Sequence, residues 1–138
     1  MFLNPEKIIN ELDIITSGMS VADFGSGSGY FTIPLSYKVG DSGSVYAIDI
    51  LENRLNLIEN QAKSKNISNI NIISANLEVL GGTNLDNNSL DAVLVANILF
   101  QSDKKIDIIK EAKRVLISGG YLIIIDWLNN NSVLLPKG

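Results

Sequence analysis

Val21-Ala22-Asp23-Phe24-Gly25-Ser26-Gly27-Ser28-Gly29 is the stretch that decides the fold of this 138-residue chain. Residues 21–24 are typical of a short buried strand, and three glycines at alternate positions follow it directly. Glycine permits positive φ and lets a ligand approach the backbone without a Cβ in the way. The stretch therefore predicts a strand, a ligand-binding loop and a following helix, with a plain glycine turn as the alternative.

The rest of the chain alternates apolar runs with segments of helical spacing, which is the rhythm of an α/β fold. Predicted strands cover residues 21–24, 45–49, 70–74, 90–96 and 121–127. Predicted helices run from Pro5 to near Gly18, over 30–39, over a stripe formed by Leu51, Leu55, Ile58 and Ala62, and over 104–116. The later strands are continuously apolar, which favours a parallel, doubly wound sheet covered on both faces. We expect a single domain over residues 1–138.

Residue usage excludes several kinds of chemistry. The chain has no cysteine and no histidine, so disulfides, thiolate sites, imidazole ligands and Ser/His/Asp triads are absent, and we expect no metal site. The formal net charge of -4 comes from scattered residues, which argues against a nucleic-acid partner. The apolar runs are too short to span a membrane. We expect a cytoplasmic protein without a membrane or nucleic-acid partner.

An acidic residue follows the glycine loop at the spacing typical of nucleotide-binding folds. Asp49 ends the second predicted strand, about 24 positions after Gly25, where a carboxylate meets the ribose hydroxyls of a bound nucleotide. The dinucleotide pattern fails, however, because its third glycine would fall on Tyr30. Asp23, directly before the loop, disfavours phosphates and favours a cationic ligand. A buried cap of the next helix is the alternative role for Asp23.

Taken together, four ordered motifs resemble those of class I S-adenosylmethionine-dependent methyltransferases, closest to the ubiquinone-biosynthesis-like branch. They are the glycine-loop run 21–32, the strand 45–50 that ends at Asp49, the strand 89–99, and Arg114-Val115-Leu116-Ile117-Ser118-Gly119-Gly120 before the fifth strand. The resemblance covers nearly the whole chain. It implies a Rossmann-like sheet of about five parallel strands in the order 3-2-1-4-5, flanked by helices.

The same resemblance implies S-adenosylmethionine as the cofactor and a set of residues that bind it. Asp23 would face the ammonium group, Asp49 the ribose, and Asn76 the adenine amino group, although the family usually has an acidic residue at that position. The implied cofactor-binding residues are Asp23, Gly25, Ser26, Gly27, Gly29, Asp49, Ile50, Asn76, Leu77 and Asn97. No catalytic residue is assigned. The implied activity is methyl transfer to a small organic acceptor.

Two other functions stay open on the sequence alone. One is a non-catalytic module or subunit that binds S-adenosylmethionine, and the other is an NAD-dependent oxidoreductase, against which Tyr30 argues. We also expect the sheet to lack the family's usual sixth and seventh strands, which would leave residues 121–125 as an exposed apolar edge. Proteins normally cover such an edge. The sequence therefore predicts a homo-oligomer built on the fifth strand.

Overall fold

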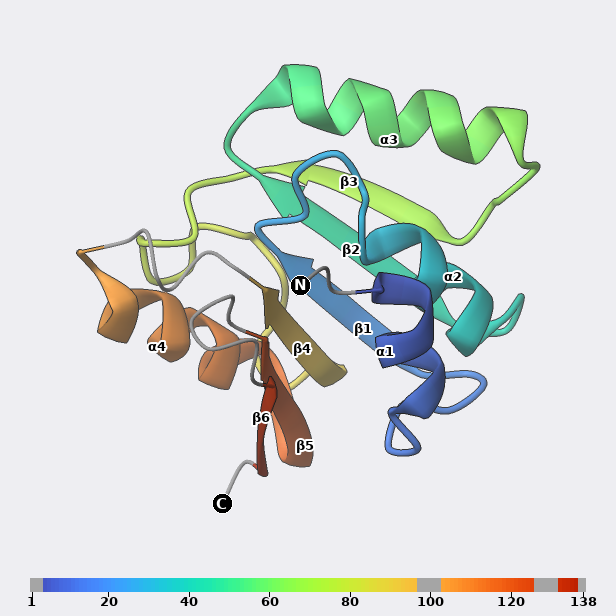
Figure 1. The fold of residues 1–138 in the computed structure, drawn as a ribbon. Coiled ribbons are helices and arrows are strands. Elements are labelled where there is room, and N and C mark those ends of the chain that lie inside the picture. Colours follow the sequence, from blue (N-terminus) through green and yellow to red (C-terminus); the bar gives the residue numbers. More distant parts are fainter. Residues whose placement is uncertain (1–3, 97–102, 126–131, 137–138) are drawn as a thin grey trace.

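The structure is a computed structural model that describes residues 4–96, 103–125 and 132–136. The helices are α1 (Pro5–Glu11), α2 (Thr32–Val39), α3 (Glu52–Ser64) and α4 (Lys105–Val115). The strands are β1 (Ser20–Phe24), β2 (Ser44–Asp49), β3 (Ile70–Ser74), β4 (Leu90–Ala96), β5 (Leu116–Ile125) and β6 (Ser132–Pro136). Figure 1 shows these elements around one central sheet.

The sheet has the order β3-β2-β1-β4-β5-β6. Strands β1 to β5 are parallel to one another, which confirms the predicted Rossmann-like order 3-2-1-4-5. Strands β2 and β3 lie on one side of β1, whereas β4 and β5 lie on the other, so the strand order switches sides between β1 and β4. Ligands bind beside such a switch point in open α/β sheets. The topology therefore places the candidate site beside the carboxyl end of β1.

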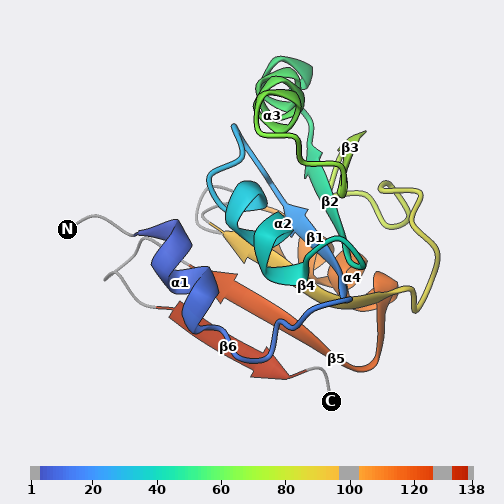
Figure 2. The same cartoon turned by 90° about the vertical axis from the view of Figure 1, so that its right-hand side faces the viewer.

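The prediction of an uncovered fifth strand is wrong. Strand β6 pairs antiparallel with β5, from Tyr121 opposite Pro136 to Ile125 opposite Ser132. Figure 2 shows the two strands side by side. This pairing covers the edge of residues 121–125, the part of β5 expected to be exposed, within the same chain, so that edge gives no reason to expect an oligomer.

Both faces of the sheet are covered, as the continuously apolar strands predict. Helices α1, α2 and α3 lie on one face and α4 on the other (Figure 1). Alternate residues of β1 serve the two layers, because side chains along a strand point to opposite faces. Val21 packs in the cluster that contains Leu35 of α2, and Phe24 packs in the cluster that contains Ile108 of α4.

Three predictions from apolar spacing differ from the structure in detail. Helix α1 ends at Glu11 rather than near Gly18. Ile15 is still buried, because the turns that follow the helix return the chain to the same face of the sheet. Leu51 is exposed because it is the N-cap residue of α3 and not part of its buried face. Strand β5 begins at Leu116 rather than at Tyr121. Leu116 pairs with Leu90 and Tyr121 with Ala92, and a register shift between these pairs accommodates the intervening residues, which include Gly119 and Gly120.

Candidate functional site

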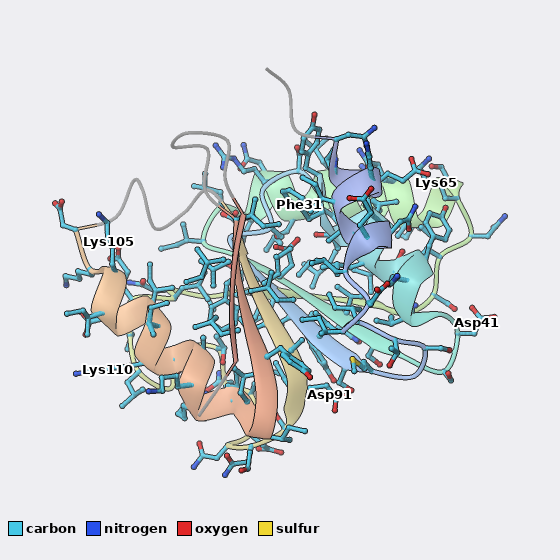
Figure 3. All side chains as sticks on the ribbon, turned by 60° about the horizontal axis from the view of Figure 1, so that its bottom comes forward. Phe31, Asp41, Lys65, Asp91, Lys105 and Lys110 are labelled. Atoms are coloured by element: carbon cyan, nitrogen blue, oxygen red, sulfur yellow. The ribbon has the colours of Figure 1, made fainter. Side chains whose placement is uncertain are left out.

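Two adjoining cavities lie at the carboxyl ends of β1 and β2. The larger has a volume of about 610 Å³ and the smaller about 200 Å³, and both are lined by Gly25, Asp49 and Ile50. Cavities of this combined size are typical of small-molecule and cofactor sites. Figure 3 labels Phe31 near this end of the sheet and Asp91 at the opposite end.

The glycine loop forms the floor of the larger cavity. The amides of Gly25 and Ser26 both donate to the carbonyl oxygen of Ile48, at 2.8 and 2.9 Å, which ties the loop to the end of β2. Gly27 has φ +56°, and a Cβ built there would meet no atom within 4 Å. The loop backbone at Gly27 is therefore open to a ligand that approaches closely, and glycine is favoured there by its backbone conformation.

Asp49 joins the glycine loop to the start of α3. Its Oδ2 accepts from the Gly27 amide at 2.9 Å, and its Oδ1 accepts from the Leu51 amide at 2.9 Å. The side chain is only 7% exposed and lines both cavities. Each carboxylate oxygen can accept a further hydrogen bond, so Asp49 can still bind two neighbouring hydroxyl groups of a ligand.

Asp23 is a buried carboxyl with few partners. It is 1% exposed and lines the larger cavity, and its Oδ2 accepts a 2.7 Å hydrogen bond from the hydroxyl of Thr32 at the start of α2. Burial raises the pKa of Asp23 to about 7, the Thr32 hydrogen bond opposes this rise, and the charge of Asp49 adds to it. A cation in the cavity would favour the ionised form of Asp23. Asp23 thus lines the cavity and accepts from the first residue of α2, but it is not the cap of that helix, whose N-cap residue is Phe31.

Ser26 carries a polar atom that the described residues leave unsatisfied. The side chain is 5% exposed and lines the larger cavity, and its Oγ is buried without a hydrogen-bond partner in the part of the chain that the structure describes. Buried hydroxyl groups normally have a partner, because an unpaired one costs roughly 1–3 kcal/mol. This orphaned hydroxyl fits a cavity that holds a polar ligand.

The wall of the smaller cavity follows β3. Asn76, Leu77 and Glu78 line it together with Ile50. The Oδ1 of Asn76, which we expected to accept from an adenine amino group, already accepts from the Glu78 amide at 2.9 Å. Only its second lone pair remains for a ligand. Leu77 is buried, so it offers backbone groups and an apolar surface to the cavity.

The cavities bring together most of the residues that the sequence predicted. Those that line one or both cavities are Asp23, Gly25, Ser26, Gly27, Asp49, Ile50, Asn76 and Leu77. Gly29 does not line either cavity; a Cβ at this position would lie 3.0 Å from Cγ1 of Ile58, so Gly29 permits close packing of the loop against α3. Asn97 lies outside the described residues.

Sequence reasoning missed several lining residues. The larger cavity is also lined by Ser28, Tyr30, Phe31, Leu51, Arg54 and Ala96, and the smaller by Ala75 and Glu78. Arg54 and Leu51 border the cavity because α3 begins at Glu52, close behind Asp49, with Leu51 as its N-cap residue. The two apolar residues Ile50 and Leu51 directly after Asp49 could have signalled that the cavity lining continues towards α3. The structure leaves them 61% and 44% exposed.

Among the described residues, no group of His, Cys, Asp and Glu side chains could hold a metal ion, and no helix is long and apolar enough to cross a membrane. The chemistry of the site, as far as the described part shows it, therefore rests on two buried carboxylates, a guanidinium, hydroxyl groups and backbone amides. These groups suit the binding of a ligand that is polar and at least partly cationic.

A family model described as a methyltransferase domain matches residues 15–134. A ubiquinone/menaquinone biosynthesis C-methyltransferase of Shewanella sediminis is 33% identical over 111 residues, which are 80% of this chain and 43% of that protein. A demethylmenaquinone methyltransferase of Lactococcus lactis is 31% identical over 110 residues, 80% of this chain and 42% of that protein. The chain thus spans less than half the length of these two curated relatives.

Solved structures agree with the sequence comparisons. A crystal structure of a SAM-dependent methyltransferase from Aquifex aeolicus superposes with a TM-score of 0.79 at 31% sequence identity. The match covers 90% of this chain and 64% of that one. The shared part includes the parallel sheet at whose carboxyl ends the two cavities lie.

Proposed function

The chain belongs to the methyltransferase domain family, and we propose that it binds S-adenosylmethionine and transfers its methyl group to a small organic acceptor. The observation that carries the proposal is the pair of buried carboxylates, Asp23 and Asp49, at one cavity beside an open glycine loop. This arrangement suits a cationic nucleoside without phosphates, since carboxylates repel phosphate groups. The orphaned hydroxyl of Ser26 supplies a further polar contact.

The residues of the cavity would bind the cofactor from both ends. Asp49 would accept from the ribose hydroxyls, while Asp23 and Ser26 would face the amino-acid portion. Ile50 and Leu77 would enclose the adenine ring, and the backbone at Gly25 and Gly27 would allow close approach. Bound S-adenosylmethionine supplies an activated methyl group on a sulfonium, so the protein needs mainly to position the acceptor and to exclude water. The absence of histidine and cysteine is compatible with this chemistry.

For the acceptor, we propose an aromatic ring of the quinone type as the first class to test. The support is the naming of two curated relatives for ubiquinone/menaquinone biosynthesis and for demethylmenaquinone methylation. A cytoplasmic location and the absence of a nucleic-acid partner are part of the same proposal, supported by the scattered charge of the chain.

Calorimetric titration with S-adenosylhomocysteine and, separately, with NAD tests the cofactor. We expect S-adenosylhomocysteine to bind and NAD not to bind; binding of NAD alone would refute the proposal. An assay of methyl transfer to a demethylmenaquinol analogue then separates an enzyme from a non-catalytic binding module. A module would bind the cofactor and methylate nothing.

The replacement Asp49→Ala tests the ribose contact. It should weaken S-adenosylhomocysteine binding by roughly 1.5–3 kcal/mol, the range for hydrogen bonds to a charged group. Asp91→Ala is the matched control, because Asp91 also accepts from a backbone amide, that of Ser20 at 2.8 Å, but lies at the opposite end of the sheet. The control should bind normally. Equal affinities for the Asp49 variant and the wild type would show that the assignment is wrong.

A further inference from the structure

The segment between β3 and β4, residues 75–89, carries one wall of the smaller cavity and contains no helix or strand. Segments of this kind have many accessible conformations, so their position depends on contacts made elsewhere. Leu77 fixes one point, since it is buried in the same core cluster as Ile108 and Ala112 of α4. At the cavity, the amide of Ala75 donates to the carbonyl oxygen of Asp49 at 3.1 Å, and further polar contacts hold the segment at residues that do not line the cavity.

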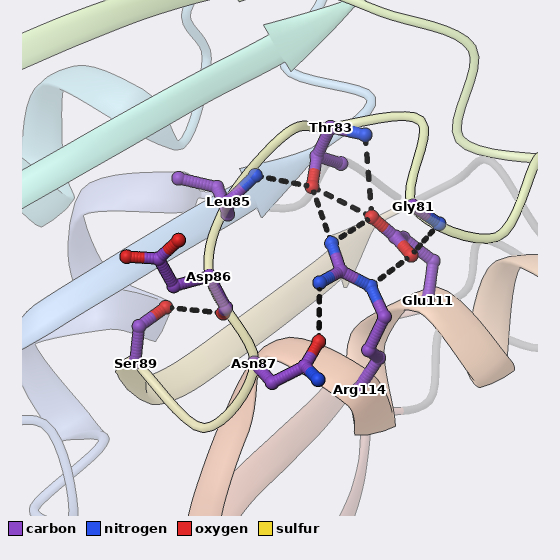
Figure 4. A network of polar contacts seen from close by, with 8 residues as sticks. All are labelled: Gly81, Thr83, Leu85, Asp86, Asn87, Ser89, Glu111 and Arg114. Atoms are coloured by element: carbon purple, nitrogen blue, oxygen red, sulfur yellow. Dashed lines mark hydrogen bonds and ion pairs between the residues drawn. The ribbon is translucent and has the colours of Figure 1, made fainter.

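Glu111 and Arg114 of α4 bind this segment at residues that do not line the cavity (Figure 4). Glu111 is 0% exposed, and its carboxylate accepts from the amide of Gly81 at 2.6 Å and from the amide and hydroxyl of Thr83 at 3.2 and 2.6 Å. Arg114 donates to both carboxylate oxygens of Glu111, at 2.8 and 2.7 Å, and to Oδ1 of Asn87 at 2.7 Å. The ion pair therefore contacts the segment at three separate residues.

One tight turn connects these contacts to the wall of the cavity. The amide of Val79 donates to the carbonyl oxygen of Asn76 at 3.3 Å, and the amide of Gly82 donates to the carbonyl oxygen of Val79 at 2.8 Å. A Cβ at Gly82 would lie 2.5 Å from the carbonyl oxygen of Asn76, so the turn is closely wound. A shift of Gly81 and Thr83 away from Glu111 would accordingly move Asn76 and Leu77.

A purely stabilising role does not explain this arrangement well. A buried ion pair can often be replaced by apolar side chains without loss of stability, whereas its directional bonds specify one conformation. Here the carboxylate binds backbone amides of the segment itself, and the guanidinium is held in a bidentate geometry that lysine cannot reproduce. The pair thus specifies the backbone position of the cavity wall.

We propose that Glu111 and Arg114 are positioning residues that set the affinity of the smaller cavity for the nucleoside part of the ligand, although neither residue lines the cavity. The inference rests on the proposed function, because the ligand is the one proposed above. Its consequence is that the strength of nucleoside binding is set from α4, by residues that do not line the cavity.

The test compares Glu111→Gln with the wild type at a temperature well below the unfolding transition of both. Glutamine keeps the shape of the side chain but removes its charge and one of its acceptors. We expect S-adenosylhomocysteine and adenosine to bind at least fivefold more weakly to the variant, and KM for the cofactor to rise while kcat changes little. Hydrogen exchange of residues 75–85 should accelerate at least tenfold, while exchange in β1 stays unchanged.

Two further variants keep the result interpretable. Ile15→Val removes a methylene from a buried residue on the other face of the sheet, so it should lower stability and leave binding unchanged. Arg114→Lys should weaken binding less than Glu111→Gln, because lysine retains the charge without the bidentate bonds. If Glu111→Gln does not fold, Thr83→Val removes a single hydroxyl from the same cluster and should weaken binding in the same direction.

The outcomes separate the two proposals. If the wild-type chain does not bind S-adenosylhomocysteine, the proposed function is wrong and the positioning role is wrong with it. If the wild type binds and Glu111→Gln binds equally well despite faster exchange in residues 75–85, only the positioning role is wrong. Weaker binding in Glu111→Gln, with Ile15→Val unchanged at a similar loss of stability, supports it.

Discussion

Asp23 at the cavity and Glu111 beneath the β3–β4 segment are both buried carboxyl groups, yet the protein treats them in opposite ways. The pKa of Asp23 rises to about 7, whereas the pKa of Glu111 falls to about 2. Burial alone would raise both, because it disfavours a charged carboxylate. The difference therefore comes from the partners.

Glu111 has a complete set of donors. Two backbone amides, the Thr83 hydroxyl, and the Nε and Nη2 groups of Arg114 stabilise its charge (Figure 4). Asp23 has the Thr32 hydroxyl alone among the hydrogen-bond donors recorded for the described residues, and the second carboxylate at its cavity, Asp49, works against its ionisation. The comparison teaches that a carboxylate with all its partners supports structure, while one left short of partners beside a cavity is available for a ligand.

The strongest way to break the comparison is to remove the satisfied carboxylate. Glu111→Ala should destabilise the fold by about 3–5 kcal/mol, because it leaves the charge of Arg114 and the amides of Gly81 and Thr83 without their partner. Urea unfolding at pH 7 measures the loss. Because the pKa of Glu111 is lowered in the folded state, its contribution is present above about pH 4.5 and is lost as the pH falls through about 2. An unchanged free energy of unfolding at pH 7 would contradict the claim that the contacts of Glu111 stabilise the fold.

The second prediction concerns the unsatisfied carboxylate, Asp23, whose contribution to stability changes with pH in the opposite direction to that of Glu111. Because the pKa of Asp23 is raised in the folded state, its stability contribution is present below about pH 3.8 and is lost as the pH rises through about 7. Asp23→Asn has no proton to lose, so at pH 8 it should be more stable than the wild type by roughly 1–3 kcal/mol. The gain should shrink towards pH 4 in thermal unfolding experiments.

The same variant should bind the cofactor more weakly, since it lacks the negative charge that faces a cation. In the wild type, S-adenosylhomocysteine affinity should rise as the pH approaches 7, because ligand binding favours the ionised form of Asp23, which Asp49 and Thr32 also influence. A pH profile of similar slope in Asp23→Asn would show that another group titrates.

The smallest predicted effect sharpens the contrast between the two sets of partners. Thr32→Val removes the hydroxyl bonded to Asp23 and should cost about 1 kcal/mol at pH 5, with a further rise in the pKa of Asp23. Thr83→Val removes one donor from Glu111 but leaves the others in place. The pKa values, followed by NMR titration of the carboxyl carbons, should therefore change more for Asp23 in Thr32→Val than for Glu111 in Thr83→Val. Equal shifts would contradict the explanation by partner number.

Much of the fold followed from the sequence because buried parallel strands need continuous apolar runs. The bounds of β3 and β4 agree with those predicted from residues 70–74 and 90–96. In the helix predicted over 104–116, the buried face was decided by packing on the sheet: Ile108 is buried, whereas Ile106 is 70% exposed. Sequence reasoning also missed β6, since the short run at residues 132–136 gains its strand character from pairing with β5.

For the site, the sequence by itself determined the elements that are local: a glycine loop after a strand, Asp23 before it, and Asp49 at the end of the next strand. Their chemistry and their place at the carboxyl ends of neighbouring parallel strands follow from residue type and order. Only the tertiary structure decided the rest. The orphaned hydroxyl of Ser26, the cavity position of Arg54 and the contacts of Glu111 with Gly81 and Thr83 depend on segments far apart in the chain. The partners that lower the pKa of Glu111 and leave that of Asp23 raised meet only once the sheet and its helices have packed.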